Sequence, residues 1–127
     1  MKIAHVALWT RRLEELRAFY AKYFGAASGE KYVNAVKGFE SYFLRFEGDA
    51  SLEIMRSAQV TEPAVPDRIG WAHLAFGVAD REAVRALTER MRRDGITVAG
   101  EPRQTGDGCY ESVVFDPDGN RIEIVAG

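Results

Sequence analysis

Ala4-His5-Val6-Ala7 begins one half of the chain, and Ala72-His73-Leu74-Ala75 begins the other half with nearly the same residues. Each tetrapeptide is followed by a glutamate between aliphatic residues, Leu52-Glu53-Ile54 in the first half and Ile122-Glu123-Ile124 in the second. The histidine and the glutamate are 48 residues apart in the first half (53 minus 5) and 50 apart in the second (123 minus 73). Because self-similarity at a near-constant distance indicates a structural repeat, the sequence predicts two modules of one design.

The first half reads as a strand, a helix and three further strands. Short runs rich in β-branched and aromatic residues predict the strands, at residues 3–9, 31–36, 41–46 and 51–55. The helix between the first two shows apolar residues at three- and four-residue spacing. Thr10 is a candidate N-cap for it, and Gly25 suits its C-terminal end.

The second half repeats this order. Its expected strands are residues 70–78, 96–99, 110–115 and 121–125, and its helix is capped by Asp80 and ended by Gly95. Asp116-Pro117-Asp118-Gly119-Asn120 predicts a turn before the last strand. The fold class is therefore α+β with two βαβββ modules, residues 1–56 and 69–127, joined by a linker at 57–68 that contains Pro63 and Pro66.

Composition excludes several classes of function. The 127 residues suit one domain, with Lys plus Arg at 17 against Asp plus Glu at 19, so nucleic acid is not the expected partner. No apolar run reaches the ~20 residues that span a bilayer, and the N-terminal residues lack the apolar run of a signal peptide. The lone Cys109 allows no internal disulfide, which suits a reducing compartment. We expect a cytoplasmic protein that binds neither nucleic acid nor membrane.

The two modules supply a candidate metal site. Strand side chains alternate between faces, so Glu53 points away from Leu52 and Ile54, and Glu123 points away from its aliphatic neighbours in the same manner. His5 and His73 are the chain's two histidines. Two imidazoles and two carboxylates suit one divalent cation such as Zn, Ni, Co, Fe or Mn, so these four residues are the candidate ligands.

Four segments resemble the vicinal oxygen chelate superfamily, which includes glyoxalase I, bleomycin-resistance proteins, methylmalonyl-CoA epimerase and extradiol dioxygenases. They are Ile3-Ala4-His5-Val6-Ala7-Leu8, the helix end at residues 19–25, Trp71-Ala72-His73-Leu74-Ala75-Phe76, and residues 115–123 with their Asp-Pro-Asp-Gly-Asn turn. The resemblance implies mixed sheets that curve around a metal cavity, the glyoxalase/bleomycin resistance/dioxygenase fold. It also implies a homodimer, and it matches His5, Glu53, His73 and Glu123 to the four metal positions of glyoxalase I.

The resemblance also implies an activity. Members with a His-His-Glu set lack the first carboxylate, so Glu53 favours a lyase or isomerase of glyoxalase I type, similar to lactoylglutathione lyase. Such an enzyme moves a proton through a metal-stabilised enediolate on a small α-hydroxycarbonyl or thiohemiacetal substrate. That small molecule can be a thiol adduct. By this likeness Glu123 is the leading catalytic base, and Glu53 is a ligand or second base.

The candidate substrate contacts are Trp9, Arg56, Trp71, Arg103 and Tyr110. Trp9 stands where glutathione-dependent members carry an arginine, so the natural thiol stays open. Two other functions also stay open. An Fe(II)-dependent extradiol-type dioxygenase needs two histidines and one carboxylate, which are available. A drug-sequestering protein of the bleomycin-resistance type would bind its ligand in an aromatic groove without a metal.

Overall fold

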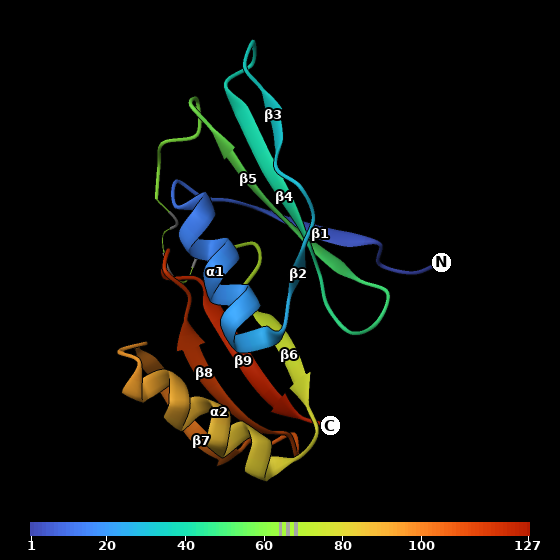
Figure 1. The fold of residues 1–127 in the computed structure, drawn as a ribbon. Helices are drawn as coiled ribbons and strands as arrows, with labels where there is room; N and C mark the ends of the chain where they lie inside the picture. Colours follow the sequence, from blue (N-terminus) through green and yellow to red (C-terminus); the bar gives the residue numbers. More distant parts are fainter. Residues whose placement is uncertain (64, 66, 68) are drawn as a thin grey trace. The chain divides into compact units, whose positions relative to one another are not determined.

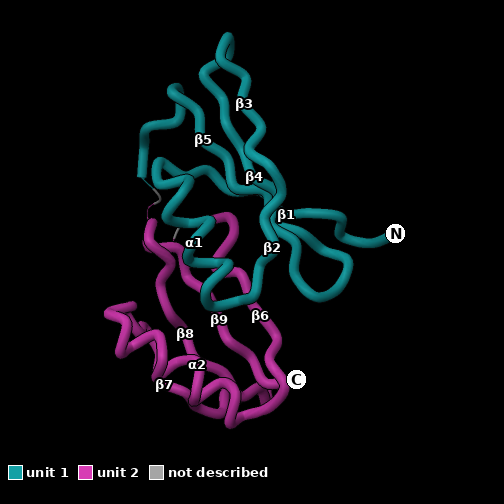
Figure 2. Tube along the Cα trace, in the orientation of Figure 1, with its two compact units in different colours: residues 1–63 teal, residues 64–127 magenta. Residues whose placement is uncertain are grey.

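A computed structural model describes residues 1–63, 65, 67 and 69–127. The chain divides into two compact units, residues 1–63 and 64–127 (Figure 2). Each unit builds one mixed sheet and one long helix (Figure 1). The chain is therefore α+β with two βαβββ modules, as the repeat predicts. The predicted linker at 57–68 includes positions 64, 66 and 68, which lie outside the described residues.

Unit 1 contains one helix and five strands in this order: β1 (His5–Trp9), α1 (Leu13–Phe24), β2 (Ala27–Ser28), β3 (Tyr32–Asn34), β4 (Phe39–Arg45) and β5 (Ser51–Ser57). The sheet order is β1-β5-β4-β2, with β3 also paired to β4. Strands β1 and β5 are parallel, and the other pairs are antiparallel. The sequence did not predict β2, because two residues are too few to show an alternating pattern.

In its described residues, unit 2 contains one helix and four strands in this order: β6 (Leu74–Val78), α2 (Arg81–Arg93), β7 (Val98–Gln104), β8 (Tyr110–Phe115) and β9 (Arg121–Ala126). The sheet order is β6-β9-β8-β7, with β6 parallel to β9. The predicted strand at 70–78 is too long, because β6 begins only at Leu74, where its pairing with Ile122 of β9 starts. The predicted strand at 96–99 continues instead to Gln104, with an irregular register against β8.

Helix α1 buries one apolar face on the sheet of unit 1. Its buried residues recur at helical spacing and are Leu13, Leu16, Phe19, Tyr20 and Tyr23. Burial of each such side chain contributes about 2 kcal/mol. Gly25 ends the helix at φ 66°, as predicted. Thr10 is not the N-cap, because the helix begins after Arg12; the Thr10 hydroxyl instead accepts a hydrogen bond from the Arg12 N–H at 2.8 Å.

Helix α2 is capped as the sequence predicts. The Asp80 carboxylate accepts a hydrogen bond from the Ala83 N–H at 2.8 Å, and Gly95 follows the helix at φ 83°. Val84, Thr88 and Met91 form its buried face. The helices have 12 and 13 residues, and within the described part of the chain neither one is long and apolar enough to cross a membrane.

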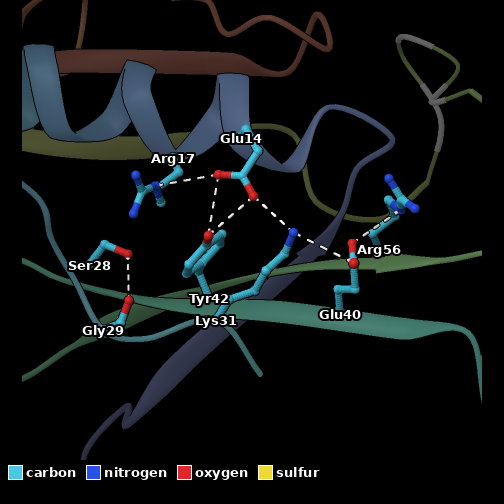
Figure 3. A network of polar contacts seen from close by, with 8 residues as sticks. All are labelled: Glu14, Arg17, Ser28, Gly29, Lys31, Glu40, Tyr42 and Arg56. Atoms are coloured by element: carbon cyan, nitrogen blue, oxygen red, sulfur yellow. Dashed lines mark hydrogen bonds and ion pairs between the residues drawn. The ribbon is translucent and has the colours of Figure 1, made fainter. Parts of the chain in front are cut away.

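A polar network ties the first turn of α1 to the sheet of unit 1 (Figure 3). The Glu14 carboxylate accepts hydrogen bonds from Tyr42 Oη at 3.1 and 3.2 Å and lies 2.9 Å from Lys31 Nζ. Lys31 also lies 3.5 Å from Glu40, which pairs with Arg56 Nε at 3.4 Å. The hydrogen bond from Lys31 lowers the pKa of Glu14, and the same bond raises the pKa of Lys31.

Candidate functional site

The two glutamates occupy the same register position in their units. Glu53 lies beside Ala7 on the neighbouring parallel strand, and Glu123 lies beside Ala75. Each of these alanines is two residues after its histidine. The aliphatic residues that flank each glutamate are buried on the helix-facing side, so both glutamates point to the opposite side of their sheets, as predicted. We call this side the open face of each unit.

Each unit brings one histidine and one glutamate together on its open face. His5 Nε2 lies 4.0 Å from Glu53 Oε2, and His73 Nε2 lies 3.2 Å from Glu123 Oε2. The imidazoles are 47% and 42% exposed, while the two carboxylates are largely covered. His5 is the first residue of β1, whereas His73 lies one residue before β6. Each pair therefore presents a nitrogen and an oxygen donor to an incoming ligand.

The nature of these donors suits a divalent cation, because imidazole nitrogen and carboxylate oxygen are common ligands of zinc and of neighbouring transition metals. Each pair supplies two donors from one unit. Within the described residues no group of three or more His, Cys, Asp or Glu side chains could hold a metal ion.

The turn before β9 fixes the start of the strand that carries Glu123. Asp116 is buried, and its Oδ1 accepts hydrogen bonds from the N–H groups of Asp118 and Asn120, both at 2.9 Å. Its Oδ2 accepts a third hydrogen bond from Asn120 Nδ2 at 2.8 Å. Gly119 supplies the positive φ of 82° that the turn requires. The predicted turn is confirmed, and it begins β9 two residues before Glu123.

Two predicted substrate contacts lie on the helix-facing side of their sheets. Arg56 shares the face of the buried Ile54, and its guanidinium pairs with Glu40. Tyr110 shares the face of the buried Ser112 and accepts a hydrogen bond from Arg85 Nη1 of α2 at 3.0 Å. Both side chains therefore point away from the open faces that carry Glu53 and Glu123.

The other predicted contacts are exposed. Trp9 lies on the open face of unit 1, and Trp71 precedes β6. The Arg103 side chain lies over Gly100 in unit 2. Its Nη1 is 3.2 Å from the position that a Cβ on Gly100 would take. Gly100 is paired with Val113, which is in register with Glu123. Arg103 therefore lies over the row of residues that includes the Glu123 carboxylate.

Sequence reasoning missed the aromatic residues around His5. Phe43 is in register with Glu53, and its ring meets the His5 imidazole edge to face, with centroids 5.4 Å apart at 78°. Phe39 and Tyr32 lie further along the same face. One signal could have found Phe43: the segment Tyr42-Phe43-Leu44 is apolar on both strand faces, a pattern typical of strands that are covered on both sides.

The repeated βαβββ fold and the repeated His–Glu register define a class of two-module α+β proteins. The family model described as Glyoxalase/Bleomycin resistance protein/Dioxygenase superfamily matches residues 2–124, and the chain belongs to this superfamily.

The chain is also similar to individual proteins over nearly its whole length. The chain is 28% identical over 130 residues to the uncharacterized protein YqjT of Bacillus subtilis (strain 168), with 96% of each chain covered. It is 28% identical to the glyoxalase family protein from Enterococcus faecalis, with a TM-score of 0.79 over 98% of this chain and 96% of that one. Glyoxalase I from Zea mays is 21% identical, with a TM-score of 0.82 over 98% of this chain. This chain spans 44% of the maize chain, and the likeness shows the fold alone.

Proposed function

We propose that this protein is a metal-dependent lyase or isomerase of glyoxalase I type that acts on a small α-hydroxycarbonyl or thiohemiacetal substrate, such as a thiol adduct. One observation carries the proposal: both units hold a His–Glu pair at the same register on the open face. Membership of the superfamily supports it. Two imidazoles and two carboxylates balance the charge of a dication and leave coordination positions for water or substrate.

In this proposal His5, Glu53, His73 and Glu123 hold one divalent cation, which can be Zn, Ni, Co, Fe or Mn. When bound, the cation would supply Lewis acidity that stabilises negative charge on the substrate's carbonyl oxygen. The Glu123 carboxylate takes the carbon-bound proton and returns it to the neighbouring carbon. Its position 3.2 Å from His73 Nε2 keeps it oriented. Glu53 is a ligand or second base.

The remaining residues take separate roles in the proposal. In this proposal Trp9, Trp71 and Arg103 contact the substrate. Each of them is exposed, and none lies on the helix-facing side of its unit. Arg56 and Tyr110 instead anchor the sheets through Glu40 and Arg85. We further propose a homodimer in the cytoplasm, which analytical ultracentrifugation and fractionation of cells would test.

Metal titration tests whether the two pairs share one cation. Calorimetric titration of the metal-free protein with Zn, Ni, Co or Mn salts should show one bound cation per chain, that is, one for its two modules. Substitution of His5→Ala or His73→Ala should each weaken binding at least about tenfold, because each histidine is one of the four ligands. Cys109→Ser is the matched control, since this exposed thiol is a metal-ligand type outside the proposed set. Loss of binding in only one histidine variant would show that the pairs do not share a cation.

An activity assay then separates the possible functions. The metal-loaded protein should convert methylglyoxal adducts of glutathione or of another thiol. Cleavage of a catechol by the Fe(II)-loaded protein, without isomerase activity, would instead support a dioxygenase. Tight drug binding by a protein that takes up no metal would support a sequestering protein.

A further inference from the structure

The backbone around His73 is held less firmly by its sheet than the backbone around His5. In unit 1 the parallel pairing of β1 with β5 begins at His5 itself. In unit 2 the pairing of β6 with β9 begins only at Leu74 and Ile122, one residue after His73. We call residues 69–73 the His73 segment. Its backbone precedes the strand pair and needs another source of order.

Packing of side chains does not supply that order. All five residues of the His73 segment are exposed, and Ile69 and Trp71 are almost completely so. Gly70 adopts a φ of 136°, which favours glycine. A segment with few buried contacts opens locally at a low cost in free energy. The position of His73 therefore depends on how the residues on either side of the segment are attached.

The residues on either side of the segment are attached to the first two residues of β9. On one side Leu74 pairs with Ile122. On the other side Asp67 Oδ1 accepts a hydrogen bond from Arg121 Nη1 at 2.7 Å, which is a short, charge-assisted contact. Arg121 lies on the same face of β9 as Glu123. The ion pair therefore anchors the chain before His73 to the strand that carries its carboxylate partner.

Unit 1 contains a corresponding ion pair that has less to hold. Lys2 Nζ lies 3.2 Å from Asp49 Oδ2, so this pair also joins the chain before the histidine to the chain before the glutamate strand. The pairing of β1 with β5 already includes His5. Loss of the Lys2–Asp49 pair should therefore leave His5 in place, which makes this pair an internal control.

We propose that Asp67 and Arg121 are positioning residues, whose ion pair holds the His73 segment so that the imidazole meets the Glu123 carboxylate before a cation binds. The contact that this would maintain is the 3.2 Å approach of His73 Nε2 to Glu123 Oε2. The inference rests on the proposed function, because it assigns how one histidine ligand of the same site is preorganised. An exposed ion pair adds little to global stability, but a small bias is enough to order a segment that opens locally.

Metal titration separates this positioning from a simple effect of charge. Asp67→Asn and Arg121→Gln should each weaken Zn binding by the metal-free protein about threefold, because either substitution breaks the ion pair. Loss of charge alone would act in opposite directions, since removal of a carboxylate disfavours a nearby cation and removal of a guanidinium favours it. Asp49→Asn makes the same change of charge in the corresponding pair of unit 1 and should leave the affinity nearly unchanged. Opposite effects of the first two substitutions, or an equal loss in Asp49→Asn, would overturn the inference.

A measurement on the metal-free protein keeps the inference separate from the proposed activity. NMR follows the imidazole signals of His5 and His73 individually. Asp67→Asn should shift the His73 signal and raise its mobility, His5 should stay as in the wild type, and Asp67→Glu should restore the wild-type signal of His73. If the protein binds no cation but His73 responds in this manner, the proposed function fails and the positioning role stands. If Asp67→Asn leaves the His73 signal unchanged, the positioning role fails whatever the activity.

Discussion

Units 1 and 2 hold the same His–Glu pair on sheets whose other open-face residues differ. Ala7 pairs with Glu53 and Ala75 with Glu123, so the two pairs are equivalent in register. The antiparallel neighbour of each glutamate also differs: Phe43 of β4 lies beside Glu53, and Val113 of β8 lies beside Glu123. Phe43 contacts His5. The repeat therefore keeps the His–Glu pair and varies the residues around it.

One position of the sheet that is equivalent in the two units forms a hydrogen bond to the helix, but the bond differs between the units. Tyr42 in unit 1 and Ser112 in unit 2 both pair with the isoleucine that follows the glutamate. The Tyr42 hydroxyl reaches the partly exposed Glu14 of α1, whereas the Ser112 hydroxyl meets Thr88 of α2 at 2.7 Å in the buried interior. Loss of a hydrogen-bond partner costs more stability for a buried hydroxyl than for an exposed one. The stability of unit 2 should therefore depend more strongly on the Ser112–Thr88 bond than that of unit 1 depends on the Tyr42–Glu14 bond.

The largest expected difference between the units concerns catalysis. Glu123→Gln should lower kcat by about 10³-fold, because a neutral amide cannot accept the substrate proton, and removal of a general base has effects of this order. The amide oxygen can still face the cation, so metal content should stay substantial. Glu53→Gln should lower kcat by only about tenfold if Glu53 serves mainly as a ligand. Steady-state kinetics and elemental analysis of both variants measure this asymmetry.

Equal losses in the two variants would show that both carboxylates move protons, and the units would then be chemically equivalent. Unchanged turnover in Glu123→Gln would contradict its assignment as the base. Val113→Ala is a suitable control, because Val113 neighbours Glu123 on the same face and has no proton to exchange.

Much of the architecture was predictable because it depends on local patterns. Asp80 caps α2, Gly25 ends α1, and the turn at residues 116–120 forms where its Asp, Gly and Asn residues predict it. The start of β6 was wrong, because strand ends depend on a partner strand that lies far away in the sequence. Thr10 was wrong as a cap for a different reason, since its hydroxyl bonds the backbone one residue before the helix begins.

The site divides in the same manner between local and distant information. The alternation of strand residues predicted the directions of Glu53 and Glu123, and the same rule places Arg56 on the face of Ile54. The contact between Phe43 and His5 needs the register of three strands, which no local pattern supplies. The convergence of the two His–Glu pairs on one cation is still a prediction.

The second prediction addresses the buried hydroxyl pair of unit 2. Thr88 donates to the Val84 carbonyl at 2.6 Å, so Ser112 donates to Thr88. Thr88→Val should lower the free energy of unfolding by about 2 kcal/mol, because it leaves the Ser112 hydroxyl buried without a partner. The double variant with Ser112→Ala should regain part of this loss, since neither buried hydroxyl then remains. Tyr42→Phe, at the position equivalent to Ser112, should cost about 0.5 kcal/mol. Urea denaturation compares the wild type with these variants and with Ser112→Ala alone, and additive losses from the two single substitutions of the pair would contradict the direct coupling.

A smaller effect is expected at the helix starts. Asp80→Ala should lower the free energy of unfolding by about 1 kcal/mol, because the Ala83 N–H loses its acceptor. Asp80→Asn keeps a capping oxygen and should cost much less. Arg12 caps α1 without a side-chain hydrogen bond, so Arg12→Ala should change stability by less than about 0.5 kcal/mol. Thermal melts compare the three variants, and equal losses for Asp80→Ala and Arg12→Ala would contradict the difference in capping.

The smallest effect is pH-dependent and belongs to unit 1. Lys31 and Tyr42 hold the pKa of Glu14 below the ordinary 4.5, so the charged carboxylate stabilises the fold above that pH, and the gain is lost as the pH falls through the lowered value. Lys31 has a raised pKa, so its share is lost only as the pH rises above about 10.5. Glu14→Gln should therefore lower Tm by about 2 °C between roughly pH 5.5 and 9, and the difference from wild type should vanish well below pH 4. Glu15→Gln, next on the same exposed turn, is the control. A difference that persists at low pH would mean that Glu14 acts through packing and not through its charge.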